Sequence, residues 1–125
     1  MKRTRTITAS LVLLSLVLPV AAHHSGSMFD VKQSVTLQGT VKAFQWTNPH
    51  CFIQLMVPGK EGPAEWSVEM GAPFEVVRTG WRPTTVKPGD SIAVVIHPLR
   101  DGKRGGLYVS ATGADGKPLE KKAKR

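Results

Sequence analysis

Two adjacent histidines, His23 and His24, stand where a secretory signal is expected to be removed. Cleavage after Ala22 gives a mature chain that begins with His23, so that a free amine and an imidazole belong to one residue. A terminal amine has a pKa of about 8 and gives up its proton readily to a metal, and imidazole is a good ligand for copper, zinc and nickel. The sequence therefore raises the hypothesis of a copper site at the mature N-terminus, with His23 as a bidentate ligand.

Such a site needs a further nitrogen, and the remaining histidines are His24, His50 and His97. Cleavage one residue earlier would put His24 third in an Ala-His-His terminus, which is a different, square-planar copper or nickel motif. The competing interpretation is that residues beside a cleavage site are mobile and bind no metal, because adjacent histidines are a weaker signal than a spaced Cys/His framework.

The first 22 residues have the three parts of a signal peptide. Lys2, Arg3 and Arg5 form a basic segment, residues 7–20 are mostly apolar, and small residues precede the expected cleavage site. The apolar run is shorter than the roughly 20 residues that span a bilayer, and no later run is comparably apolar. The sequence thus predicts a periplasmic or secreted protein without a transmembrane segment.

The net charge of +8 is concentrated at the two ends of the chain. Three positive charges lie in the signal, and a net +4 lies in residues 117–125, which leaves a body with a net charge of +1. No aromatic residue is interleaved with the lysines of the tail, so nucleic-acid binding is not expected. We expect a disordered basic tail, with weak contact to an anionic surface as the alternative.

Alternation of apolar and polar residues predicts strands separated by turns, with one short helix that begins at Pro73 and ends at Gly80. The expected strands cover residues 35–46, 50–57, 64–70, 91–97 and 107–112. Three strands, a helix and two strands is the order of a mainly β, OB-like five-stranded barrel, and a small open sandwich is the alternative. We expect an N-terminal arm over residues 23–34, in which Met28 and Phe29 dock on a barrel of residues 35–116.

The expected inward face of the last strand contains Leu107, Val109 and Ala111. Cys51 also has inward parity and no basic neighbour, so it is interpreted as a core residue. As the only cysteine it cannot form an intramolecular disulfide.

An aromatic group near the first turn is a candidate surface for a ligand or a partner protein. Phe44, Trp46 and Phe52 have outward parity on either side of the turn that contains Asn48. A bulge that returns some of these side chains to the core, or cover by the arm, is an equally good interpretation. Glu65 and Glu69, four positions apart on one outward face of a strand, are each expected to lie either in solvent as an ordinary surface charge or near His50 across the ladder, where a carboxylate could support it as a ligand.

A series of short blocks resembles a family of small exported bacterial proteins known as domain of unknown function 6152. The blocks in order are His23-His24-Ser25, Phe29-Asp30, Gly39-Thr40-Val41, Trp46-Thr47-Asn48-Pro49-His50, Trp66 with Glu69, Gly71 with Pro73, Arg78 with Gly80-Trp81, and Lys87-Pro88-Gly89-Asp90. The resemblance implies an exported β-rich domain and no established activity. It favours His50 as the third histidine of a site, whereas the usual connectivity of an OB barrel favours His97.

These observations predict a small exported binding protein, with copper binding through His23, His24 and His50 as the leading hypothesis. The alternative is a metal-free interaction module that uses the surface around Trp46. The sequence contains no recognisable catalytic motif: a nucleophile elbow, a phosphate-binding loop and a dinucleotide fingerprint are all missing. An enzyme is therefore not expected.

Overall fold

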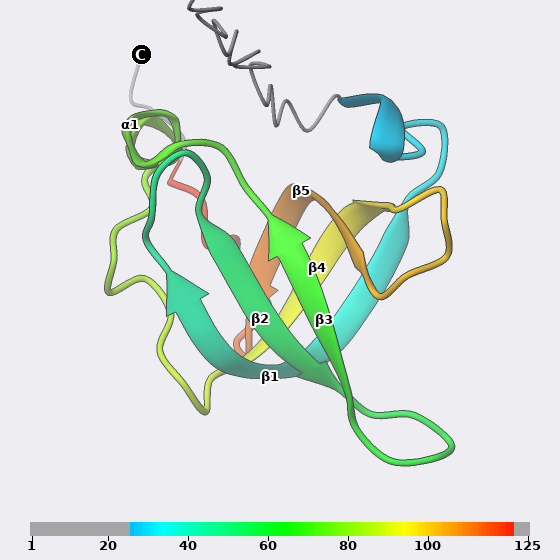
Figure 1. Ribbon diagram of the computed structural model, residues 1–125. Coiled ribbons are helices and arrows are strands. Elements are labelled where there is room, and N and C mark those ends of the chain that lie inside the picture. The colour runs from blue at the N-terminus through cyan, green and yellow to red at the C-terminus, as the bar shows by residue number, and fades with distance from the viewer. Residues whose placement is uncertain (1–25, 122–125) are drawn as a thin grey trace, which may run out of the picture.

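The computed structural model describes residues 26–121, and within this range five strands form a closed barrel in the order β1-β2-β3-β5-β4 (Figure 1). One short helical segment lies between β3 and β4. The elements are η1 (Gly26–Met28), β1 (Val35–Gln45), β2 (Phe52–Val57), β3 (Ala64–Glu69), α1 (Pro73–Val76), η2 (Val77–Thr79), β4 (Ser91–Pro98) and β5 (Gly105–Gly113). The structure thus confirms the predicted mainly β, OB-like barrel. The expected signal peptide, His23 and His24 lie outside the described residues.

Antiparallel pairing joins β1 to β2, β2 to β3, β1 to β4 and β4 to β5. The barrel closes through a short parallel contact in which Ser67–Glu69 of β3 faces Gly105–Leu107 of β5. The long first strand β1 pairs with β4 through its first half and with β2 through its second half, and it passes close to β2 at Gly39. A Cβ at this position would clash with the carbonyl oxygen of Met56, which explains the glycine on an otherwise apolar face.

The interior of the barrel is filled by the apolar side chains of alternating strand positions, as period-two patterning requires. Burial of each large aliphatic side chain stabilises the fold by about 1.5–3 kcal/mol. The fully buried members are Trp81, Ile53, Leu55, Ile96, Val41, Val68, Val94 and Cys51. The core position expected for Cys51 is confirmed.

A β-bulge in β1 inverts the alternation that the sequence suggests. Val41 faces Leu55 and Ala43 faces Gln54, so Lys42 is the extra residue. Beyond the bulge Phe44 pairs with the buried Ile53, and both Phe44 and Trp46 pack against the core cluster. The outward orientation expected for Phe44 and Trp46 is therefore replaced by an inward one, which is the outcome that a bulge produces.

A second bulge has the same effect on β5. Ile96 of β4 pairs with Tyr108, whereas the preceding Val95 pairs with Ser110, so Val109 is the extra residue. Its side chain is 44% exposed, and the inward position expected for Val109 is wrong. Tyr108 packs against the core in its place.

The predicted helix over residues 73–80 is divided into two turns of different type. Pro73 begins α1, where the carboxylate of Glu75 accepts a hydrogen bond of 2.9 Å from the backbone N–H of Ala72. The 3-10 turn η2 continues the chain and ends at Gly80, whose φ of 93° favours glycine. Trp81 then enters the core with no exposed surface.

The chain beyond β5 folds back onto the barrel. Pro118 forms a bridge with Thr112, and the backbone N–H of Leu119 donates to the carbonyl of Ala111 at 2.9 Å. Residues 117–121 are therefore part of the domain, which the sequence pattern had placed at 35–116. Across residues 26–121 no helix has the length and hydropathy that a membrane span requires.

Candidate functional site

His50 lies just before β2 and is held against the end of β3. Its Nδ1 atom is 2.6 Å from Oε1 of Glu69. Two backbone hydrogen bonds fix this corner, because Cys51 donates to Gly71 at 2.9 Å and Met70 donates to Cys51 at 2.8 Å. The side chain of Glu69 is 12% exposed and that of His50 is 34% exposed, so the carboxylate is inside the corner and the imidazole is at its rim.

This pairing orients the imidazole and determines which nitrogen can bind a ligand. The carboxylate accepts from Nδ1, so the neutral ring has its lone pair on Nε2. Within residues 26–121 no hydrogen bond or ion pair reaches Nε2 of His50. Metal-binding histidines in proteins characteristically donate their second ring nitrogen to a carboxylate or carbonyl, which holds the ring and increases its basicity. The His50–Glu69 pair has this arrangement.

A second histidine, His97 near the end of β4, has a similar geometry with a different partner. Its Nδ1 atom is 2.6 Å from the backbone carbonyl oxygen of Gln33. Because a carbonyl can only accept, Nδ1 is the donor and Nε2 is again the nitrogen with a lone pair. Gln33 belongs to the N-terminal arm, so this contact joins the arm to β4.

The arm is attached to the end of β4 by several further contacts. Phe29 is 4% exposed and forms an isolated bridge with Leu99, which confirms the expected docking of this segment. Asp30 donates its N–H to Pro98 at 2.8 Å, and Arg100 donates to the carbonyls of Met28 and Ser27, each at 2.9 Å. The described arm is thus fixed beside His97, and none of these contacts reaches His50.

The register of the sheet places both histidines at one end of the barrel. Phe52 pairs with Glu69, Glu69 with Leu107, and Leu107 with His97, which gives one continuous row across β2, β3, β5 and β4. Neighbouring strands are about 4.8 Å apart, so Glu69 and His97 are separated by about 10 Å along this row. In Figure 1 the loop from β1 to β2 and the helix η1 both lie at the upper end of the barrel.

The remaining candidate residues occupy different surroundings. Phe44 contacts Trp46 and Trp81 edge-on, with ring centroids 5.7 and 5.5 Å apart. Phe52 is partly buried beside Glu69, and Asn48 is exposed in the turn between β1 and β2. The aromatic group around Trp46 is therefore largely part of the packing of the barrel.

Two other side chains near His50 have clear structural roles. Burial raises the pKa of the Cys51 thiol, although a backbone hydrogen bond at Thr47 opposes the effect. Glu65 forms an exposed ion pair of 2.6 Å with Lys42 and does not approach His50. In the described part of the chain, no group of three or more His, Cys, Asp or Glu side chains has the arrangement of a complete metal site. A site at His50 needs ligands from elsewhere.

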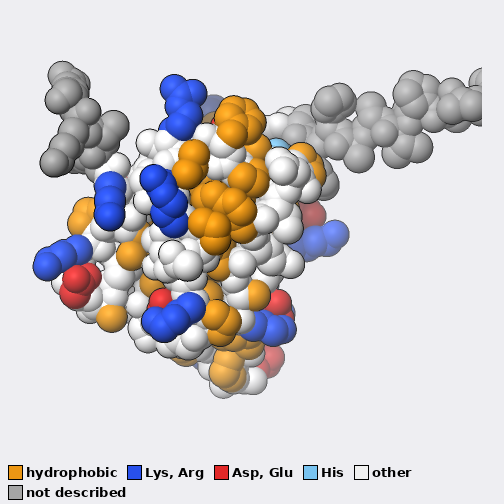
Figure 2. Space-filling view, turned by 90° about the vertical axis from the view of Figure 1, so that its left-hand side faces the viewer, with side chains coloured by type: hydrophobic (Ala, Val, Ile, Leu, Met, Phe, Trp, Pro, Cys, Tyr) orange, Lys and Arg blue, Asp and Glu red, His pale blue; other side chains and the backbone are white. Residues whose placement is uncertain are grey.

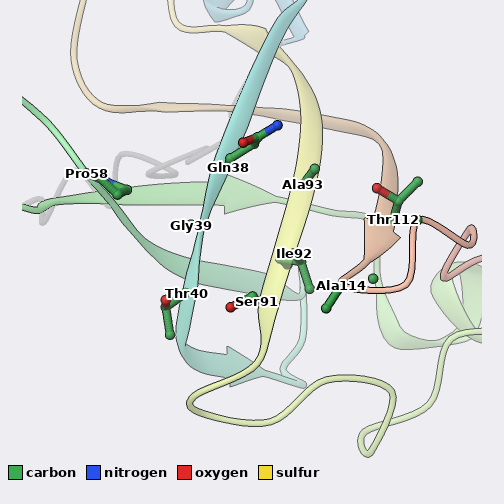
Figure 3. A pocket seen from close by; sticks show the side chains of 11 residues that line it. Gln38, Gly39, Thr40, Pro58, Ser91, Ile92, Ala93, Thr112 and Ala114 are labelled. Carbon is green, nitrogen blue, oxygen red and sulfur yellow. The ribbon is translucent and has the colours of Figure 1, made fainter.

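A hollow among the described residues lies at the opposite end of β4, on the outside of the barrel. It has a volume of about 490 Å³ and is lined by β1, β4 and β5 (Figure 3). The polar side chains that line it are Gln38, Thr40, Ser91 and Thr112. None of the lining residues is ionisable, so the hollow offers hydrogen bonds but no acid, base or strong metal ligand.

Comparison with known proteins places the chain in a family. The model of the family of unknown function DUF6152 matches residues 11–110. The chain belongs to this family. No curated protein matches it. A solved structure with a similar fold is the mitochondrial single-stranded DNA-binding protein Rim1 of S. cerevisiae, with 8% identity and a TM-score of 0.48 over 66% of this chain and 94% of that chain.

Proposed function

We propose that this member of the DUF6152 family is an exported copper-binding protein, in which His50 is the ligand supplied by the folded barrel. The mature N-terminus supplies the amine and imidazole of His23, and His24 is a further ligand. The observation that supports the proposal is the contact of 2.6 Å between Nδ1 of His50 and the carboxylate of Glu69. It leaves Nε2 as the donor atom and places a negative charge behind the ring of a ligand to a cation.

The covalent chain keeps His23 close to the start of the described structure. His23 is three residues before Gly26, so the two Cα atoms are at most about 11 Å apart. Gly26 begins η1, and Figure 1 shows η1 at the same end of the barrel as the β1–β2 loop. Imidazole and amine nitrogens together suit Cu(II), which prefers nitrogen ligands in a tetragonal arrangement.

The decisive experiment uses the processed protein. Intact-mass analysis of protein recovered from the periplasm first tests whether the chain begins at His23. Titration with Cu(II) in the presence of a competing chelator then measures affinity for the processed protein and for a variant with one extra Gly before His23. The extra residue moves the amine away from the His23 ring, and we expect it to lower the affinity at least tenfold. Equal affinities would exclude a site built on the terminal amine.

His50→Gln tests the contribution of the barrel separately. Gln keeps a hydrogen-bonding side chain of similar size beside Glu69 but has no imidazole nitrogen. We expect at least tenfold weaker Cu(II) binding and a thermal unfolding temperature close to that of the parent protein. If His50→Gln binds Cu(II) as tightly as the parent, the N-terminus binds without His50 and the proposed site is wrong.

A further inference from the structure

We propose that the face around α1 binds the same face of a second copy of this protein, an association that does not depend on the proposed copper site. The face has an exposed knob, formed by Phe74 and Arg78, and beside it a hollow with apolar walls and two carboxylates. Two copies related by a two-fold axis can each insert the knob into the hollow of the other. This is the self-complementary arrangement of a symmetric dimer.

The hollow lies between α1, η2 and β5 and has a volume of about 270 Å³. A cavity of about 150 Å³ in a protein already holds a benzene molecule, so this hollow is large enough for one phenyl ring. Its lining includes the side chains of Met70, Val76, Tyr108 and Val109 and the carboxylates of Glu75 and Glu120. An apolar ring therefore finds apolar walls in it.

Exposed apolar side chains are concentrated at this face. Phe74 is 67% exposed on α1, and Val109 is 44% exposed at the bulge of β5, where it lines the hollow. These are two of the three strongly exposed large apolar side chains within residues 26–121, and the third is Val31 of the arm. Figure 2 shows the side of the molecule on which α1 lies, where apolar side chains form a group at the surface. Such grouping is typical of an interaction site.

The charges at the knob and in the hollow are complementary. Glu75 and Glu120 each accept one hydrogen bond from a backbone N–H, at 2.9 and 3.2 Å, and neither has an ion-pair partner within residues 26–121. In the same part of the chain Arg78 also has no ion-pair partner. Arg78 follows Phe74 by about one helical turn, so the two side chains are neighbours. Insertion of the ring therefore brings the guanidinium of one copy toward the carboxylates of the other.

A second copy fits this face better than a partner that has charges of one sign. Residues 73–82 and 120–121 contain three cations and two carboxylates, so the described face is nearly neutral and contains both signs. A purely acidic or purely basic partner would be repelled by one half of it. A copy of the same face offers a cation to the hollow and carboxylates to the knob, and its shape matches in the same way.

Sedimentation velocity of the full processed chain, without copper, tests the proposal. Because an interface of modest size binds weakly, the series runs from about 5 to about 500 µM protein, and we expect a reversible monomer–dimer equilibrium within it. Burial of one phenyl ring is worth a factor of about ten or more in affinity. The dimer contains two such rings, so Phe74→Ser should weaken association by about 100-fold with an unchanged unfolding temperature. Val31→Ser, at the exposed apolar residue of the arm, is the matched control and should change association less than about twofold.

Charge reversal tests whether the partner is a second copy. Arg78→Glu, and separately the double variant Glu75→Lys with Glu120→Lys, should each associate at least about tenfold more weakly than the parent, because like charges then face each other. An equimolar mixture of the two proteins should recover most of the parent affinity, since every contact between unlike copies again joins opposite charges. Lys60→Glu, in the exposed turn between β2 and β3, has the same net charge as Arg78→Glu and should not restore association when mixed with the double variant.

The double variant loses two acceptors of backbone hydrogen bonds, so its unfolding temperature is measured first. If it does not fold, Glu75→Gln with Glu120→Gln replaces it, because the amide oxygens still accept these bonds while the charges are lost. We expect this pair to weaken association by about tenfold.

Four results would overturn the proposal. They are a monomer at every concentration, an effect of Phe74→Ser no larger than that of Val31→Ser, a mixture that associates no better than the Lys60→Glu control, and unchanged association of the Gln pair. Truncation after Lys121 should leave association unchanged. Its loss on truncation would assign the contact to residues 122–125 instead of the face around α1.

Discussion

Two corners at the same end of the barrel each hold a histidine by its Nδ1 atom at 2.6 Å, yet the oxygen atoms that hold them differ in kind. His50 faces the carboxylate of Glu69, which belongs to β3 inside the domain. His97 faces the backbone carbonyl of Gln33, which belongs to the arm. Glu69 thus places a negative charge beside its histidine, whereas Gln33 links its histidine to the N-terminal arm.

This difference indicates different roles for the two rings. A carboxylate behind an imidazole offsets the charge of a cation bound at Nε2 and makes the ring a better donor. A backbone carbonyl orients the ring but adds no charge, and the arm gains a hydrogen bond that helps to fix its position. We therefore expect metal affinity to depend on the His50 corner and stability of the arm to depend on the His97 corner.

Phe29→Ala should have the largest effect, because it acts at the corner assigned to stability. Phe29 is 4% exposed and is the main apolar anchor of the arm on β4. Removal of a buried phenyl ring costs about 3–5 kcal/mol in free energy of unfolding. Urea denaturation followed by tryptophan fluorescence measures the loss. The matched control is Val31→Ala in the same arm, where the side chain is 56% exposed and a change within about 0.5 kcal/mol is expected. If Phe29→Ala changes the free energy of unfolding as little as Val31→Ala, docking of the arm adds nothing to stability.

Glu69→Gln is expected to weaken Cu(II) binding by about 10–100-fold, which is the usual cost of losing a carboxylate that supports a metal-binding histidine. The amide oxygen of Gln can still accept from Nδ1 of His50, so the ring stays oriented while the charge is lost. Competition titration with a chelator measures the affinity. Glu65→Gln is the control, because Glu65 lies on β3 like Glu69 but pairs with Lys42 of β1, and its loss should leave Cu(II) binding unchanged. If both variants weaken Cu(II) binding equally, the effect comes from the net charge of the protein, and the proposal that Glu69 supports His50 as a ligand is wrong.

His97→Leu, which keeps the bulk of the side chain but has no donor, should produce the converse result. Loss of the hydrogen bond to Gln33 costs about 1 kcal/mol in stability, and faster hydrogen exchange is expected at the amides of residues 28–33. Cu(II) affinity should stay within twofold of the parent value. A large loss of Cu(II) affinity in His97→Leu, with none in His50→Gln, would show that His97 and not His50 is the ligand.

The sequence pattern predicts the strands and the barrel, but it does not predict which side chains of each strand face the core. Along β2, which contains no extra residue, the alternation of apolar and polar residues matches the burial, and the apolar Ile53 and Leu55 both have no exposed surface. The bulge at Lys42 reverses the orientation of Phe44, and the bulge at Val109 exposes a residue expected in the core. Bulges depend on the pairing partner, which a single strand does not reveal.

The same distinction separates the two histidine corners. Contact between Glu69 and His50 follows from the pairing of β2 with β3, because His50 lies just before β2 and Glu69 ends β3. The sequence predicts this contact as one of two alternatives for the carboxylate. The partner of His97 is a backbone carbonyl, and every residue has one. Residue identity could not indicate that Gln33 would be the acceptor, because the path of the arm decides it.

Cys51 gives the smallest expected effect and lies at the edge of the corner proposed to bind copper. It is adjacent to His50 in sequence, but its side chain points into the core and has no exposed surface. Only a thiolate binds a metal strongly, and a buried neutral thiol does not. We therefore expect Cys51→Ala to bind Cu(II) within twofold of the parent, and iodoacetamide to leave Cys51 unmodified until urea unfolds the protein. Rapid alkylation of the native protein, blocked by Cu(II), would instead make the thiol a ligand and would extend the site from the rim of the barrel into its core.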